Sequence, residues 1–151
     1  MTETTTYADP FFGAAVSVFA TTFGTAVQRR EPRTFEPTIT AVIGFSGKLV
    51  GSMILDLSEQ VAIEATRAML GGGGEPTPDD VLDATGELAN IIAGTAKTAL
   101  AEFSLSMGLP SLVTGKGHSV QFLKQVELET ILLTCEWGDL AIQVGLGPHN
   151  N

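Results

Sequence analysis

The chain has 151 residues, of which 44% are hydrophobic, and this suits one ordinary domain with a sizeable core. Its formal net charge is −9, from 17 acidic against 8 basic residues, and no stretch concentrates Lys or Arg. Because such a surface repels phosphate groups, we expect neither nucleic acid nor an anionic membrane as a partner, and we predict a single domain over residues 1–151.

The first residues, 1–10, are polar and lack the basic start and apolar centre of a signal peptide. No apolar run approaches the roughly 20 residues that a membrane helix needs. Cys135 is the lone cysteine, so an internal disulfide and a cysteine-based metal cluster are both excluded. These features predict a cytoplasmic protein with no metal of its own.

Residues 9–27 carry apolar side chains at helical spacing, which predicts a first helix. The expected buried stripe is Phe12, Val16, Phe19, Phe23 and Val27. Residues 38–45 then alternate in the manner of a strand, Ser46-Gly47 can form a tight turn, and residues 49–55 are largely apolar. This pattern predicts a β-hairpin.

Ser58 is predicted to cap a helix over residues 59–70. The next helix start is more explicit, with Thr77 as N-cap, Pro78 at the first helical position and two aspartates where carboxylates complement the helix dipole. Nothing interrupts the helical pattern until about Met107, so we predict a long central helix of about eight turns.

Further strands are predicted after this helix, at residues 111–115, 119–124, 129–137 and 139–146. A turn at Gly138-Asp139 would join the last two. Two hairpins separated by helices indicate an α+β domain, with a mainly antiparallel sheet in one layer and helices in the other.

The long helix has two different faces. The face expected to pack on the sheet consists of Val81, Leu88, Ile92, Ala96, Ala99 and Phe103. The opposite face carries Asp83, Glu87, Asn90, Gly94 and Lys97, with Gly86 near its margin. A glycine inside a helix costs about 1 kcal/mol relative to alanine, so the two glycines indicate either close packing or the approach of another molecule. The spacing alone is also that of an ordinary solvated face.

The segment from Gly86 to Gly94 reads Gly-Glu-Leu-Ala-Asn-Ile-Ile-Ala-Gly and holds a Glu-x-x-Asn pair. Met69-Leu70-Gly71-Gly72 precedes it and residues 110–115 follow it. In this frame the chain resembles the CheC/CheX/FliY phosphatase family of bacterial chemotaxis, from about residue 11 to residue 147. The CheC and FliY branches commonly carry two such motifs, whereas this chain shows one on a helix, which favours the CheX branch.

The resemblance implies a hydrolase of two-component signalling that dephosphorylates the aspartyl phosphate of a CheY-type response regulator. It implies that Asn90 positions the attacking water and that Glu87 pairs with the lysine of the receiver domain. Mg²⁺ is expected on that receiver and no cofactor on this chain, and a homodimer through sheet edges is implied as well. Four residues of the same face are candidate partner contacts, with solvent exposure or core packing as the alternative: Asp83, Gly86, Gly94 and Lys97.

Two other functions are compatible with the sequence. One is a non-catalytic CheX-like module that docks a receiver or another signalling protein, although docking alone would not need the amide of Asn90. The other is a structural dimer whose sheet edge recruits a further protein. Receiver binding that is independent of phosphorylation, without turnover, would separate both from the enzyme.

Overall fold

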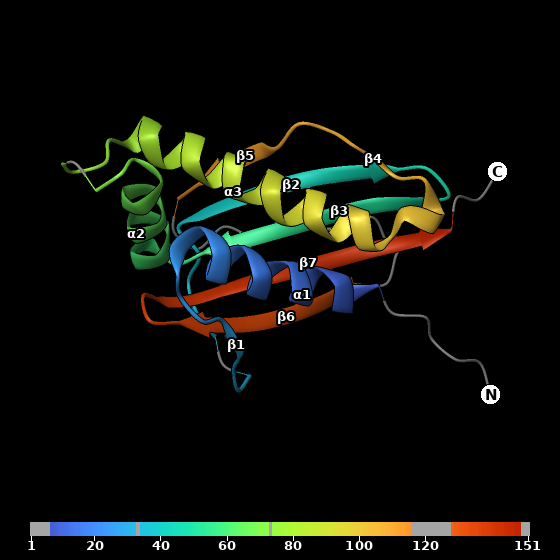
Figure 1. Ribbon diagram of the computed structural model, residues 1–151, viewed down its shortest axis with the longest axis horizontal. Helices are drawn as coiled ribbons and strands as arrows, with labels where there is room; N and C mark the ends of the chain where they lie inside the picture. The colour runs from blue at the N-terminus through green and yellow to red at the C-terminus, as the bar shows by residue number, and fades with distance from the viewer. Residues whose placement is uncertain (1–6, 33, 73, 116–127, 149–151) are drawn as a thin grey trace.

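The structure is a computed structural model that describes residues 7–32, 34–72, 74–115 and 128–148. These residues form one antiparallel sheet with helices packed on one of its faces (Figure 1). The predicted α+β architecture is therefore confirmed. In the described ranges, no helix combines the length and the apolar character needed to cross a membrane.

Two long hairpins make up the centre of the sheet. β2 (Ile39–Ser46) pairs with β3 (Leu49–Leu57), and β6 (Leu128–Cys135) pairs with β7 (Gly138–Pro148). β3 and β7 pair with each other, so the strand order is β1-β6-β7-β3-β2-β4, with β5 also beside β2. The short strands at the edges are β1 (Gln28–Arg29), β4 (Ser106–Met107) and β5 (Ser111–Thr114). The predicted strand at 119–124 lies outside the described residues.

The turn of the second hairpin lies two residues earlier than predicted. Cys135 and Gly138 face each other as the last pair of the ladder, so Glu136 and Trp137 form the turn. Gly138 begins β7 with a φ of 136°, a conformation that favours glycine. Burial raises the pKa of the Cys135 thiol, which therefore stays protonated at neutral pH.

The core lies between the sheet and the helices. Because side chains alternate along a strand, each long strand turns one apolar row toward the helices. The fully buried members of these rows are Ala41 and Ile43 on β2, Met53, Leu55 and Leu57 on β3, Leu133 on β6, and Leu140 and Ile142 on β7. The helices therefore pack on a continuous apolar surface.

α1 (Ala8–Val18) is shorter than the predicted helix and continues as one π-helical turn, Phe19–Phe23. Gly24 then takes a left-handed conformation with a φ of 65°, and the Thr25 N–H donates to the Phe19 carbonyl over 3.2 Å, which ends the helix. Of the predicted stripe, Phe19 and Val27 are buried, whereas Phe12, Val16 and Phe23 are only partly covered. The buried residues of α1 itself are Ala8, Phe11, Ala14, Ala15 and Val18.

α2 (Glu59–Met69) and α3 (Pro78–Ala99) begin where the sequence predicts. Ser58 occupies the N-cap of α2, but its side chain makes no capping hydrogen bond. Thr77 caps α3: its Oγ1 accepts the Asp80 N–H over 3.1 Å, and its own N–H donates to the Asp80 carboxylate over 2.9 Å. α3 lies beside α1 across the sheet, and α2 covers one end (Figure 1).

α3 ends at Ala99 and not near residue 107, as the uninterrupted helical pattern predicted. A short 3₁₀ turn, Ala101–Phe103, follows, and Ser104 reverses the backbone with a φ of 51°. This reversal lets Leu105 enter the core and Met107 pair with Phe45 of β2. Tertiary pairing therefore overrides the local preference for helix.

The prediction of which α3 residues pack on the sheet is confirmed for the middle of the helix and wrong for its ends. Leu88, Ile92 and Ala96 are fully buried. Val81 is only partly buried and Ala99 is exposed. Phe103, the sixth expected member, is partly buried but lies beyond the end of the helix. The long helix is thus anchored by about three of its turns.

Candidate functional site

The outward face of α3 presents polar side chains at one-turn intervals. Asp83 and Glu87 are exposed, and Asn90 is partly buried. Among the residues that the structure describes, neither Glu87 nor Asn90 has a hydrogen-bond or ion-pair partner for its side chain. Both groups are therefore available to another molecule.

Asn90 and Glu87 border a shallow depression of about 320 Å³. Residues of α3 form its floor, and Pro110, just before β5, and Leu112, within β5, form the wall. Sequence periodicity did not identify this wall, because Pro110 and Leu112 reach α3 through the pairing of β5 with β2. The sequence predicted a strand at residues 111–115 but not its place beside α3.

The two glycines of this helix have different surroundings. A Cβ added at Gly86 would lie 3.5 Å from Leu112 Cδ2 and 3.5 Å from Pro110 Cγ, whereas one added at Gly94 would meet nothing within 4 Å. Gly86 is buried, so the wall of the depression packs directly over it. Packing within the chain does not explain Gly94, since the space beside it is open.

A second hollow, of about 560 Å³, begins at Gly94 and continues toward the end of α3. Lys97 and Thr98 line it on the helix, and Ser104 and Met107 line it on the following segment. Lys97 lies in the last turn of α3, where a cation complements the helix dipole. The outward face of α3 is thus acidic at Asp83, near the start of the helix, and basic at Lys97, in its last turn.

Two acidic side chains of α3 lie close together at Glu87. Asp83 and Glu87 are four residues apart on one helix, where like charges repel by a few tenths of a kcal/mol. The sequence contains no Lys or Arg between residues 68 and 96. A cation from another molecule would remove this repulsion. Within the described ranges, no group of three His, Cys, Asp or Glu side chains is arranged to hold a metal ion.

The functional groups of this face are one amide, that of Asn90, and the carboxylates of Asp83 and Glu87. An amide can accept a hydrogen bond and donate one at the same time, so it can orient a single water molecule. A carboxylate can form a charge-assisted hydrogen bond to a lysine. The face can therefore position reactants that another protein supplies.

A protein-family model described as "Chemotaxis phosphatase CheX" matches residues 39–134, which is more than half of the chain and includes all of α3. The chain belongs to the CheX family. It is 30% identical over 104 residues to the CheY-P phosphatase CheX of Thermotoga maritima, a match that covers 60% of this chain and 67% of that protein.

Solved structures agree with this membership of the CheX family. The chemotaxis protein CheX from Vibrio vulnificus has a TM-score of 0.85 and 25% identity, and the match covers 97% of this chain and 100% of that one. The CheX of the CheX–CheY–BeF₃–Mg²⁺ complex from Borrelia burgdorferi has a TM-score of 0.73 and 17% identity, with 93% and 97% of the two chains covered. The second likeness concerns the fold alone.

Proposed function

We propose that this chain is a chemotaxis phosphatase that hydrolyses the aspartyl phosphate of a CheY-type receiver domain. Three observations support the proposal. The chain belongs to the CheX family, a relative is named a CheY-P phosphatase, and a structural neighbour was crystallised with CheY. The observation that carries it is that Glu87 is exposed and Asn90 partly buried on one helix face, and that neither side chain hydrogen-bonds another residue in the part of the chain that the structure describes.

Asn90 is proposed to orient the attacking water. In the reaction, the water oxygen bonds to phosphorus while the bond between phosphorus and the aspartate oxygen breaks, which yields inorganic phosphate and the free carboxylate. The receiver and its own Mg²⁺ supply the charge stabilisation. The added contribution of Asn90 is position, since its amide can hold a water in line with the bond that breaks.

Glu87 is proposed to pair with the active-site lysine of the receiver. Residues three apart on a helix have their Cβ atoms about 5–6 Å apart, so the lysine contact fixes where Asn90 enters the receiver. A charge-assisted pair at this point also cancels the repulsion between Asp83 and Glu87. Glu87 therefore sets the docking register, and Asn90 acts on the water.

The remaining residues of the face have supporting roles in this proposal. Asp83 steers a basic partner surface, and Lys97 marks the opposite, basic end of the contact. Gly94 allows the backbone of α3 to be approached closely, because the space beside it is open. Gly86 lets Pro110 and Leu112 pack against α3, so we assign it to the wall of the depression.

The homodimer implied by the family resemblance stays a prediction. β1 has only two residues paired with β6, which has eight, and Leu128 at the start of β6 is 40% exposed. This edge is where we expect two copies to meet. Sedimentation equilibrium of the purified chain will give twice the monomer mass if they do, and the monomer mass if the expectation is wrong.

The proposed activity is tested by following the decay of phosphorylated CheY-type receivers from the same cell. Wild-type protein should shorten the lifetime of the phosphate on at least one receiver, and Asn90→Ala should not. Thr95→Ala is the matched control, because Thr95 is exposed on the same helix and its hydroxyl donates only to the Ile91 carbonyl. An unchanged lifetime with wild-type protein on every receiver rejects the phosphatase.

A further inference from the structure

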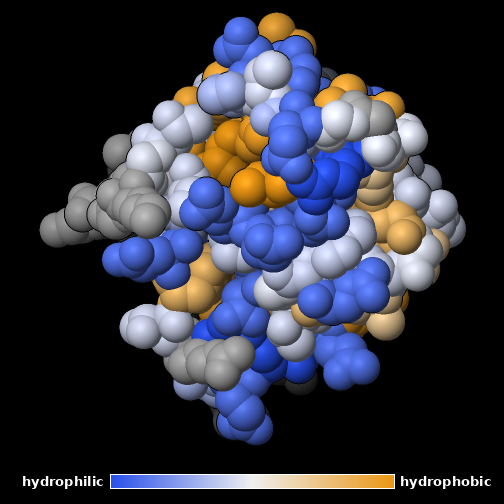
Figure 2. Space-filling view, turned by 90° about the vertical axis from the view of Figure 1, so that its left-hand side faces the viewer, coloured by the Kyte–Doolittle hydropathy of each residue, from blue (hydrophilic) through white to orange (hydrophobic). Residues whose placement is uncertain are grey.

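An apolar groove lies between α2 and the first turns of α3, at the end of the molecule away from Lys97. Its volume is about 390 Å³. Figure 2, which views this end, shows an apolar patch bordered by hydrophilic side chains. We call it the α2–α3 groove, and its central apolar members are Ile39, Ala62, Ile63, Pro76, Val81 and Leu82.

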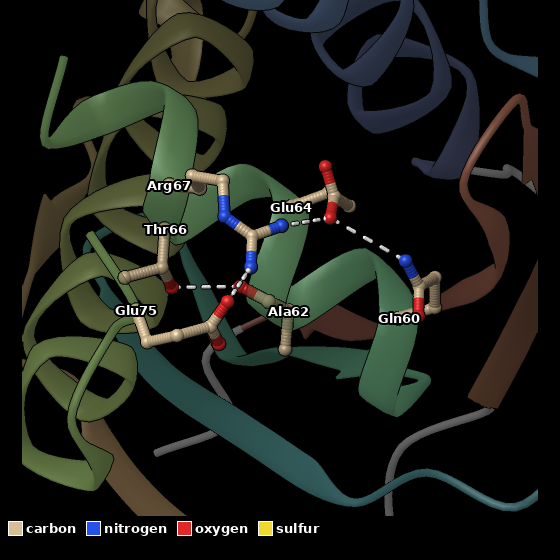
Figure 3. A network of polar contacts seen from close by, with 6 residues as sticks. All are labelled: Gln60, Ala62, Glu64, Thr66, Arg67 and Glu75. Carbon is tan, nitrogen blue, oxygen red and sulfur yellow. Dashed lines mark hydrogen bonds and ion pairs between the residues drawn. The ribbon is translucent and has the colours of Figure 1, made fainter. Parts of the chain in front are cut away.

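Polar contacts connect α2, one wall of the groove, with the segment before α3. Arg67 of α2 forms an ion pair with Glu64 on its own helix, and its Nη2 lies 2.8 Å from Glu75 Oε1 in the segment before α3 (Figure 3). The capping box at Thr77 fixes the first turn of α3 beside this contact. These contacts connect α2 with the segment that leads into α3, and the groove is already present in the single chain.

The α2–α3 groove lies next to the depression at the proposed catalytic residues, because Leu82 lines both. Leu82 and Asn90 are eight residues apart on α3, or about 12 Å at the helical rise. An ordinary domain of about 100 residues has a radius of gyration near 13 Å. A receiver domain seated over Asn90 is therefore large enough to cover the groove at the same time.

Among the described residues, acidic side chains lie at the α2–α3 groove. Glu59 lines it on the α2 side. Asp79 and Asp83 are exposed on α3 and stand next in sequence to the lining residues Pro78 and Leu82. Arg67 is the single basic residue of α2, and it is engaged by two carboxylates. A partner surface complementary to the groove would present an apolar side chain flanked by Lys or Arg. Its positive charge has the same sign as the lysine proposed to meet Glu87.

We propose that the α2–α3 groove receives an apolar side chain, flanked by basic residues, from the same receiver domain that Asn90 dephosphorylates. This inference rests on the proposed function. The groove lies away from the reacting atoms, so its contact is equally strong in the ground state and in the transition state. It therefore sets affinity and the choice among receivers, and it leaves the rate at saturation unchanged.

The test compares Ile63→Gln with Leu70→Gln. Both side chains belong to the α2 region, and Ile63 lines the groove outside the core cluster, whereas Leu70 is 50% exposed and does not line it. Binding is measured calorimetrically with CheY-type receivers held in the activated form by beryllofluoride and Mg²⁺, and turnover is measured with the phosphorylated receivers. Ile63→Ala, a milder truncation, replaces Ile63→Gln if that variant does not fold.

Ile63→Gln should weaken binding to the activated receiver by about 5- to 10-fold with an unchanged rate at saturation, and Leu70→Gln should do neither. If wild-type protein accelerates decay and Ile63→Gln binds as tightly as wild type, the groove inference is overturned while the phosphatase stands. If wild-type protein neither binds nor accelerates decay on any receiver, both fall. The groove inference is also overturned if Ile63→Gln and Leu70→Gln lose the same affinity for the activated receiver.

Discussion

Gly86 and Gly94 lie roughly two turns apart on α3, and the two stretches of helix around them differ in what they contact. At Gly86 the chain itself is close, with Pro110 and Leu112 packed above the helix. At Gly94 the surroundings are open, although glycine costs a helix interior about as much there. Packing within the chain therefore accounts for Gly86, whereas for Gly94 we propose contact with another molecule.

The largest effect on stability is expected on the inner side of the helix. Leu88 is fully buried, so Leu88→Ala should lower the free energy of unfolding by about 2–5 kcal/mol. Asn90→Ala, on the outer side, should change it by less than about 0.5 kcal/mol. Urea denaturation measures both. If Asn90→Ala lowered the free energy of unfolding as much as Leu88→Ala, the distinction between the inner and the outer side of α3 would be wrong.

The comparison of the two glycines is sharpened by placing the same side chain at each. Gly86→Leu should destabilise the fold by about 1–3 kcal/mol, because the new side chain meets Pro110 and Leu112. Gly94→Leu should stabilise it by about 0.5–1 kcal/mol through better helix propensity, yet weaken receiver binding. Thermal unfolding and receiver titration measure the two effects. If Gly94→Leu binds the receiver as wild type does, Gly94 is not a contact.

The smallest effect is expected at Asp83. Asp83→Asn removes the repulsion with Glu87 and should raise the stability of the fold by about 0.2–0.5 kcal/mol. It should also slow association with the receiver at low ionic strength, and this difference should vanish at high salt. Stopped-flow association at several salt concentrations measures it. An association rate for the variant that equals wild type at low salt would remove Asp83 from the steering role.

The sequence was most informative where structure is set locally. The N-cap at Thr77, the start of α2 and the two hairpins all follow from neighbouring residues and are confirmed, except that the turn of the second hairpin lies two residues earlier than predicted. The end of α3 could not be predicted in this way, since residues 100–107 continue a helical pattern and leave it only to reach β2. The π-helical turn at Phe19–Phe23 was not predicted either, because the apolar spacing of this segment fits an ordinary helix.

The candidate site likewise has one part that local sequence predicts and one part that depends on distant strand pairing. Helical spacing alone made Glu87 and Asn90 neighbours, and the structure places them on one face beside a depression. Pro110 and Leu112 could not be assigned to that depression, because their position depends on strand pairing far along the chain. The roles of Glu87 and Asn90 come from the family frame and not from spacing, so they are the part of the account that most needs a direct measurement.

That measurement is the dependence of receiver dephosphorylation on receiver concentration for Asn90→Ala and Glu87→Ala. Asn90→Ala should lower the rate at saturation by about 100-fold and change the half-saturating concentration by less than about threefold. Glu87→Ala should raise the half-saturating concentration by about tenfold or more and leave the rate at saturation within about threefold. Two variants that lower the saturating rate and raise the half-saturating concentration to the same extent would contradict the assignment of water positioning to Asn90 and docking to Glu87.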